Sequence, residues 1–183
     1  MQKIKNTKVI AVMGMLIAVS VILGYMKIPV NSLIEIRFTN LPIALGGVLL
    51  GPLAGGLVGA LSDIVQYIAK PTGPYFPGFT ISYGLTGVIF GLILKKDSSS
   101  AITMKRIVLA EICVTLLVTI PLNSFWLALL YGKGFITVLG SRLLKEIVML
   151  PINTILLATV VKPASRFNRI FLPLGVDRKG AAN

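Results

Sequence analysis

The chain has 183 residues, of which 55% are hydrophobic and 13% are charged. Soluble domains carry about 25% charged residues, so this composition excludes an ordinary soluble domain and indicates an all-α, polytopic membrane protein. The formal net charge of +12 does not indicate nucleic-acid binding, because the chain offers no polar surface on which a basic groove could form. Histidine is absent, which removes the commonest general base and the commonest zinc ligand.

The apolar segments follow one another along the chain with short connections. The first, 9–26, follows a basic leader and has no cleavage site of the Ala-x-Ala type, so we interpret it as a retained span rather than a signal peptide. The later segments cover 41–69, 79–94, 107–131 and 139–161. Cys113, the single cysteine, is interpreted as a small buried hydrophobic residue. We expect one membrane domain, residues 1–170, and a basic cytoplasmic tail, residues 171–183.

The segment 41–69 crosses the membrane either once or twice. Gly51-Pro52 interrupts it, since proline removes a backbone hydrogen bond and clashes with the preceding turn. Two crossings place twelve of the 18 basic residues on the cytoplasmic side, in agreement with the positive-inside rule. We therefore predict six transmembrane helices with both termini cytoplasmic. Because 29 residues extend only about 43 Å as a helix, one helix is short or extends into the flanking connection, and we favour the extension.

The connection 70–78, KPTGPYFPG, differs in composition from its surroundings. The six-helix topology makes it extracellular, together with the connections 27–40 and 132–138. Its prolines restrict φ, and Tyr75 and Phe76 offer rigid apolar area. Such a loop suits a lid or a wall of a pocket, or it is an ordinary tight connection between helices.

Asp63 is an ionisable residue within an apolar segment. Such a group costs roughly 2.5–3.5 kcal/mol on membrane-insertion scales and faces protein or water. Gln66 and Tyr67 lie on the same helix face as Asp63, and Gly55 and Gly59 continue this face inward, where another helix can approach closely. Asp63 is either a structural hydrogen-bonding centre or an acceptor for an amino-substituted ring of a ligand.

The outer half of the predicted molecule is basic. Arg142, Lys145 and Glu146 lie within one turn at the start of the last segment, and Asn153 returns to nearly the same face. Arg37 lies in the first outer connection. Six basic residues against two acidic ones give this half a net charge of about +4, which membrane insertion does not require on this side. We therefore predict an anionic ligand, which arginine binds through its bidentate guanidinium group.

Four other residues have weaker signals. Asn123 and Trp126 lie three residues apart in the outer half of 107–131, where a tryptophan lines a pocket or marks the membrane interface. Glu111 and Asp97 lie toward the inner side, and we interpret both as interfacial or solvated charges.

Gly14 and Ala18 form a small-x-x-x-small face on the first apolar segment. This pattern brings helix backbones close together. It serves either packing inside the protein or docking onto another membrane subunit.

Three stretches carry a resemblance to a known family. They are GPLAGGLVGALSDIVQYI, PTGPYFPGFTISYGLTGVIFGLIL, and LNSFWLALLYGKGF with SRLLKEIVMLPINTILL. The chain resembles the substrate-binding S components of energy-coupling-factor (ECF) vitamin transporters, and in particular their folate family, from about residue 10 to residue 161. The resemblance implies a protein of a bacterial cell membrane that binds its vitamin outside. It also implies assembly with a transmembrane scaffold subunit and two cytoplasmic ATPases, and toppling in the membrane to deliver the vitamin.

The resemblance also bears on the first helix and on ATP. The family has an Ala-x-x-x-Ala motif that contacts the scaffold, and Gly14 and Ala18 occupy the matching positions here. The sequence contains no GxxxxGK[ST] loop, so we expect ATP hydrolysis by the partner subunits and not by this chain. We expect no catalytic residues, metal or cofactor.

Folate agrees with the chemistry of the predicted site. Its pterin ring offers an amino-pyrimidine edge for Asp63 and flat faces for aromatic side chains, and its two carboxylates suit the basic residues. The predicted ligand-binding residues are Arg37, Asp63, Tyr67, Phe76, Phe79, Tyr83, Asn123, Trp126, Arg142 and Lys145.

Three alternatives remain open at this point. The first alternative is an S component for another vitamin, such as pantothenate, a thiamine precursor or riboflavin. The second is a membrane enzyme, and the third is a self-sufficient channel or secondary carrier. The basic outer half disfavours a neutral pyrimidine, and the absence of histidine and of paired acids on one helix face disfavours an enzyme. No inverted repeat supports a carrier.

Overall fold

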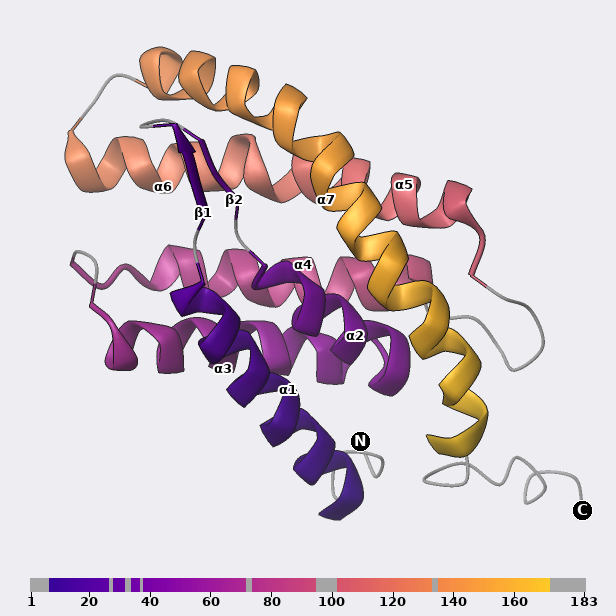
Figure 1. Ribbon diagram of the computed structural model, residues 1–183. Helices are drawn as coiled ribbons and strands as arrows, with labels where there is room; N and C mark the ends of the chain where they lie inside the picture. Colours follow the sequence, from indigo (N-terminus) through magenta and orange to yellow (C-terminus); the bar gives the residue numbers. More distant parts are fainter. Residues whose placement is uncertain are drawn as a thin grey trace, which may run out of the picture.

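The computed structural model describes residues 7–26, 28–31, 34–36, 38–71, 74–94, 102–132 and 135–171, and within these ranges the protein is a bundle of helices (Figure 1). The helices are α1 (Thr7–Tyr25), α2 (Asn40–Leu50), α3 (Pro52–Ala69), α4 (Pro77–Leu94), α5 (Met104–Val114), α6 (Pro121–Tyr131) and α7 (Phe135–Phe171). A π-helical turn, Thr115–Thr119, joins α5 to α6. A helical bundle is what the composition predicts.

Two short strands depart from the all-α expectation. β1 (Ile28–Asn31) and β2 (Ile34–Ile36) pair antiparallel, with Ile28 opposite Ile36. Their sequences are rich in β-branched residues, which favour strands. The hairpin lies between α1 and α2 in the chain, so it occupies the first predicted connection and leaves the helical core unchanged.

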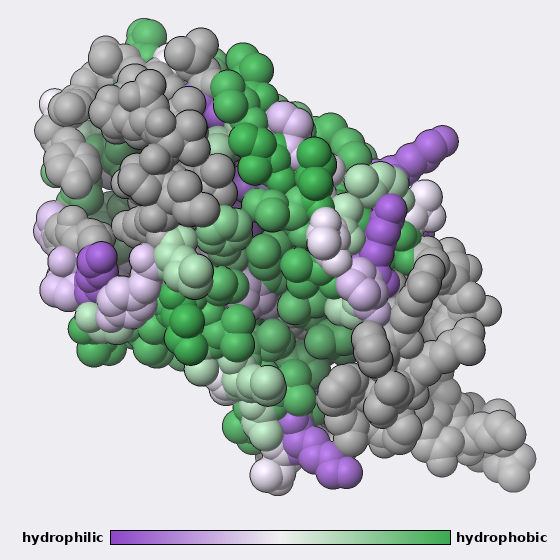
Figure 2. All heavy atoms as spheres, in the orientation of Figure 1, coloured by the Kyte–Doolittle hydropathy of each residue, from purple (hydrophilic) through white to green (hydrophobic). Residues whose placement is uncertain are grey.

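Five helices are long and apolar enough to cross a membrane in the part of the chain that is described. They cover Thr7–Tyr25, Pro52–Ala69, Pro77–Leu94, Met104–Leu130 and Val138–Ala164. Figure 2 shows hydrophobic side chains over much of the described part of one face. Large apolar side chains such as Leu92, Ile136 and Ile147 are more than half exposed, which is the surface expected of a protein surrounded by lipid.

The break at Gly51-Pro52 divides 41–69 into a short and a long helix. Gly51 has φ 99° and ψ 178°, a backbone conformation that favours glycine, and Pro52 begins α3. The expected extension into a flanking connection is wrong, because α2 begins at Asn40 and α3 ends at Ala69. The 11 residues of α2 span only about 16 Å, about half of the hydrocarbon core.

Helices α2, α3 and α4 pack through glycine backbones. A Cβ atom added at Gly55 would lie 2.6 Å from Gly47 Cα, and one added at Gly87 would collide with the carbonyl of Gly55. A Cβ atom added at Gly59 would likewise collide with the Tyr83 carbonyl. The prediction that Gly55 and Gly59 admit a neighbouring helix is therefore confirmed. Such close approach of backbones is typical of membrane helices.

A buried apolar cluster closes the end of the bundle where α4 ends and α5 begins. Phe90, Leu94, Ile107, Leu157 and Val161 are fully or almost fully buried in it. The cluster fills the space between α4, α5 and α7 at this end, and the polar side chains of the same helices lie beyond it.

Candidate functional site

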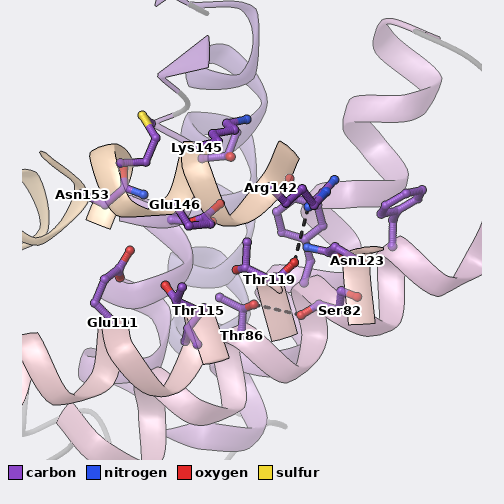
Figure 3. Close-up of a pocket in the computed structure, with 16 residues that line it drawn as sticks. Ser82, Thr86, Glu111, Thr115, Thr119, Asn123, Arg142, Lys145, Glu146 and Asn153 are labelled. Atoms are coloured by element: carbon purple, nitrogen blue, oxygen red, sulfur yellow. Dashed lines mark hydrogen bonds between the residues drawn. The ribbon is translucent and has the colours of Figure 1, made fainter. Parts of the chain in front are cut away.

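A cleft opens between α4, the α5–α6 helix and α7, beside the start of α2 (Figure 3). It contains about 890 Å³ of space, part of it open to solvent, within the range of about 300–1,000 Å³ that small-molecule sites occupy. Its lining residues are Thr39, Asn40, Phe79, Ser82, Tyr83, Thr86, Glu111, Val114, Thr115, Thr119, Asn123, Arg142, Lys145, Glu146, Met149 and Asn153. Most of these are polar, although the helices that carry them are apolar overall.

One wall of the cleft is a polar stripe along the α5–α6 helix. Glu111, Thr115, Thr119 and Asn123 are spaced four residues apart, and all four line the cleft. In a regular α-helix each step of four residues rotates by about 40°, so three steps would turn Asn123 about 120° away from Glu111. A π turn rotates by a smaller angle per residue about the helix axis than an α-helix does, because it closes i→i+5 hydrogen bonds. The turn at Thr115–Thr119 therefore keeps the stripe on one face.

Pro121 accounts for the position of this turn. Proline has no N–H, and its ring clashes with the carbonyl one turn earlier, so a regular α-helix cannot continue through it. The Ile120 N–H instead donates to the Thr115 carbonyl at 2.9 Å, across five residues. The Thr119 carbonyl accepts a hydrogen bond from Arg142 Nη1 at 3.4 Å. The irregular turn thus also holds an arginine of α7.

The opposite wall comes from α7 and carries most of the charge. Arg142, Lys145, Glu146 and Asn153 line it, which confirms the prediction that Asn153 shares a face with Arg142. Glu146 interacts electrostatically with Lys145 and Arg142. With Glu111 on the facing helix, two cations and two carboxylates line the cleft, so its charge is mixed rather than uniformly positive.

Aromatic residues border the same cleft. Phe79 and Tyr83 of α4 line it. Trp126 stands behind them, where its Nε1 donates to Ser82 Oγ at 3.2 Å and its ring centroid lies 5.4 Å from that of Phe76. Trp126 and Phe76 therefore form a second layer that supports the lining residues.

Asn123 is a lining residue with an unusual hydrogen-bonding state. Its Oδ1 atom is buried and has no hydrogen-bond partner within the described ranges. Buried polar atoms are nearly always hydrogen bonded. A donor that reaches this oxygen, from a ligand or a water molecule, would satisfy it.

Asp63 lies outside the lining of the cleft, between the C-terminal half of α3 and the start of α4. Thr80 Oγ1 donates to Asp63 Oδ2 at 2.6 Å, and the Tyr75 hydroxyl lies 3.0 Å from the same threonine oxygen. Because the single threonine proton goes to Asp63, Tyr75 is the donor in the second bond. The Tyr67 ring packs against Tyr75, with centroids 5.0 Å apart. Two roles were considered for Asp63, a structural hydrogen-bonding centre and an acceptor for a ligand. These contacts support the structural role.

The remaining predicted residues fall in different places. Arg37 lies outside the described residues, and so does Asp97. Gly14 and Ala18 are exposed on α1, and a Cβ atom at Gly14 would meet nothing within 4 Å. Gly14 therefore does not serve packing inside the described part of the protein.

The interpretation of Glu111 as an interfacial or solvated charge is wrong. Its side chain is only 3% exposed, and Asn153 of α7 faces it across the cleft (Figure 3). Sequence reasoning missed Glu111, Thr115 and Thr119 because their stripe appears only once the π turn is placed. The signal that could have located them is the four-residue spacing followed by Pro121.

Known proteins match this chain over most of its length. The family model for the substrate-specific component of ECF transporters matches residues 8–161. The chain belongs to this family of S components. A folate transporter, FolT, of Clostridium novyi (strain NT) is 33% identical over 162 residues, which cover 88% of this chain and 92% of that protein. FolT of Leuconostoc mesenteroides subsp. mesenteroides is 26% identical, over 81% of each chain.

Solved structures agree with the S-component assignment. A crystal structure of FolT bound with folic acid superposes with a TM-score of 0.76 at 34% identity, over 86% of this chain and 94% of the other. A structure of the S component of a bacterial ECF transporter gives a TM-score of 0.60 at 27% identity, over 85% and 95%. This S component is therefore a multi-pass protein of a bacterial cell membrane, and the resemblance seen in the sequence is confirmed.

Proposed function

We propose that this S component binds folate outside the cell with high affinity and delivers it through an ECF transporter. The observation that carries the proposal is the cleft, which combines cations of α7 with aromatic rings of α4. The similarity to folate transporters, and to a FolT structure that contains folic acid, supports the same ligand. Folate has two aromatic systems and two carboxylates, so it requires both kinds of lining.

The basic residues suit the glutamyl tail of folate. Arg142 and Lys145 line the cleft from successive turns of α7, and a guanidinium group binds a carboxylate through two parallel hydrogen bonds. Arg37, in the first outer connection, is a further candidate for the second carboxylate. Phe79 and Tyr83 offer their rings to the aromatic part of folate, with Trp126 and Phe76 as the supporting layer.

The topology that accompanies this function has six membrane helices and cytoplasmic termini. The five long apolar helices and the short α2 supply them, and the basic tail, residues 171–183, then lies inside. A membrane-impermeant thiol reagent should label Pro74→Cys in intact cells but not Lys105→Cys, each in a Cys113→Ser background. Labelling of Lys105→Cys alone would contradict this orientation.

We expect the transport cycle to depend on partner subunits. The exposed Gly14 and Ala18 of α1 offer a flat surface for the transmembrane scaffold. The sequence lacks a GxxxxGK[ST] loop, so ATP hydrolysis falls to two cytoplasmic ATPase subunits. The chain itself is a binding subunit and not an enzyme.

A titration of the purified chain tests the ligand. Trp126 is the single tryptophan, and its indole is hydrogen bonded to the lining residue Ser82, so its fluorescence should report occupancy of the cleft. Folate should change the signal saturably at nanomolar concentrations, whereas pantothenate and riboflavin should not bind. Saturable binding of another vitamin without a response to folate would refute the proposal, and Trp126→Phe provides the blank.

A further inference from the structure

The cleft has two chemically different ends. Arg142 and Asn123 lie together beside the start of α6, and we call this the basic end (Figure 3). Glu111 and Asn153 lie together toward the start of α5, and we call this the acidic end. Asn153 follows Arg142 by eleven residues on α7, so the two ends are about 16 Å apart along that helix.

The acidic end is built around one buried carboxylate. Glu111 is 3% exposed and lines the cleft. A carboxylate offers about four lone-pair sites, and the Asn153 side chain of α7 faces this one. A buried carboxylate is stable only when it is well hydrogen bonded. A ligand that offers two adjacent N–H donors would therefore satisfy this group in a bidentate manner.

Folate has its own two ends, and they match those of the cleft. The 2-amino-4-oxopteridine ring carries adjacent donors, the exocyclic amine and the ring N3–H, on one edge. The carboxylates lie at the far end of the molecule, beyond the benzoyl ring. The carboxylates repel Glu111 and attract Arg142, whereas the donor edge does the reverse. Although Glu146 also lines the cleft beside Arg142 and Lys145, the charges at the two ends thus favour one orientation of the ligand.

We propose that Glu111 is the specificity-determining acceptor of the pterin donor edge, with the glutamyl tail at the basic end. This inference rests on the proposed binding of folate. It moves the pterin contact from Asp63, whose Oδ2 is bonded to Thr80, to a carboxylate that lines the cleft. It also places Phe79 and Tyr83, which line the cleft from α4, against the benzoyl part of folate.

The test compares folate with an analogue in which a methyl group replaces the 2-amino group. The purified wild-type chain should bind folate on the order of 100-fold more tightly than this analogue, because the analogue leaves a buried carboxylate oxygen without its donor. Glu111→Gln should lower this ratio to about 3-fold or less, mainly through loss of folate affinity. An unchanged ratio in Glu111→Gln would overturn the inference.

Two further variants locate the effect. Asp63→Asn is the matched control, a carboxylate-to-amide change outside the cleft, and it should leave the ratio as in the wild type. Arg142→Ala should weaken both ligands by the same factor, since both carry the glutamyl tail. If Asp63→Asn bound folate and the methyl analogue equally well, the pterin contact would belong to Asp63 instead.

The result separates this inference from the proposed function. If the wild-type chain does not bind folate, the proposed function itself is wrong. If it binds folate and the methyl analogue equally well, folate binding stands and the role of Glu111 falls, even if Glu111→Gln cannot be purified in a folded state.

Discussion

The two sides of this bundle are packed in opposite ways. Helices α2, α3 and α4 meet through glycines, so close that a methyl group at Gly87 would collide with the Gly55 backbone. On the other side, α7 faces the α5–α6 helix through long polar side chains such as Arg142 and Glu111, and a cleft remains between them. Backbone contact excludes a cavity, whereas long side chains around an irregular turn preserve one. The tight side therefore gives the bundle its rigid part, and the loose side holds the cleft in which we propose that the ligand binds.

The largest effect should come from adding volume to the tight side. Gly87→Leu places a side chain against the Gly55 backbone, which has no rotamer to relax into, and we expect a loss of about 3 kcal/mol or more of stability. Gly140→Leu is the matched control, because a Cβ atom there meets nothing within 4 Å. Thermal unfolding in detergent measures both. A Gly87→Leu protein as stable as Gly140→Leu would contradict the description of the tight side.

The next largest effect should come from removing charge on the loose side. Arg142→Ala should weaken folate about 100-fold, in the range measured when one partner of a buried charge pair is removed. It should weaken a pterin that lacks the glutamate by less than about 3-fold, because that ligand has no carboxylate to lose. Calorimetric titration of the two ligands gives both values. Equal losses would place Arg142 away from the tail.

A smaller effect should follow from straightening the α5–α6 helix. Pro121→Ala restores the missing N–H and allows a regular α-helix, which turns Asn123 away from Glu111. We expect about 10-fold weaker folate binding, equivalent to one misplaced hydrogen bond, with unchanged or higher thermal stability. Binding and unfolding measured on the same preparation test this. Unchanged affinity would mean that the π turn does not position the polar stripe.

The smallest effect on the isolated protein should come from the exposed face of α1. Gly14→Leu should leave folate affinity unchanged, since nothing in the described structure lies near its side chain. It should nevertheless abolish uptake in cells that express the scaffold and ATPase subunits, because a bulky residue separates the helices. Lost binding in the purified variant would show that α1 supports the cleft.

The sequence predicted the class of the fold better than its irregularities. Hydrophobic runs and the distribution of lysine and arginine predicted a membrane bundle, and Gly51-Pro52 marked the break before α3. The length of α2 was not predictable, because nothing local distinguishes a short helix from one that extends into its connection. The β-hairpin was missed for a similar reason, since two short strands contribute little to a hydropathy pattern.

The site was predictable only where one regular helix carries it. Arg142, Lys145 and Asn153 follow α-helical periodicity on α7, and sequence reasoning placed them on one face. Glu111 was missed because its place in the cleft depends on the π turn at Thr115–Thr119, which follows it on the same helix, and on Asn153 of the facing helix. For Asp63, the hydrogen bond from Thr80 supports the structural alternative, and its contact with a ligand stays a prediction.

Protection of the cleft by folate tests the central claim most directly. In a Cys113→Ser background, Thr119→Cys places a thiol in the wall of the cleft, and Ile136→Cys places one on the exposed surface of α7, where Ile136 is 83% exposed. Folate should slow modification of Thr119→Cys by a small water-soluble methanethiosulfonate reagent by at least about 10-fold and leave Ile136→Cys unaffected. Equal rates at Thr119→Cys with and without saturating folate would show that the vitamin binds elsewhere.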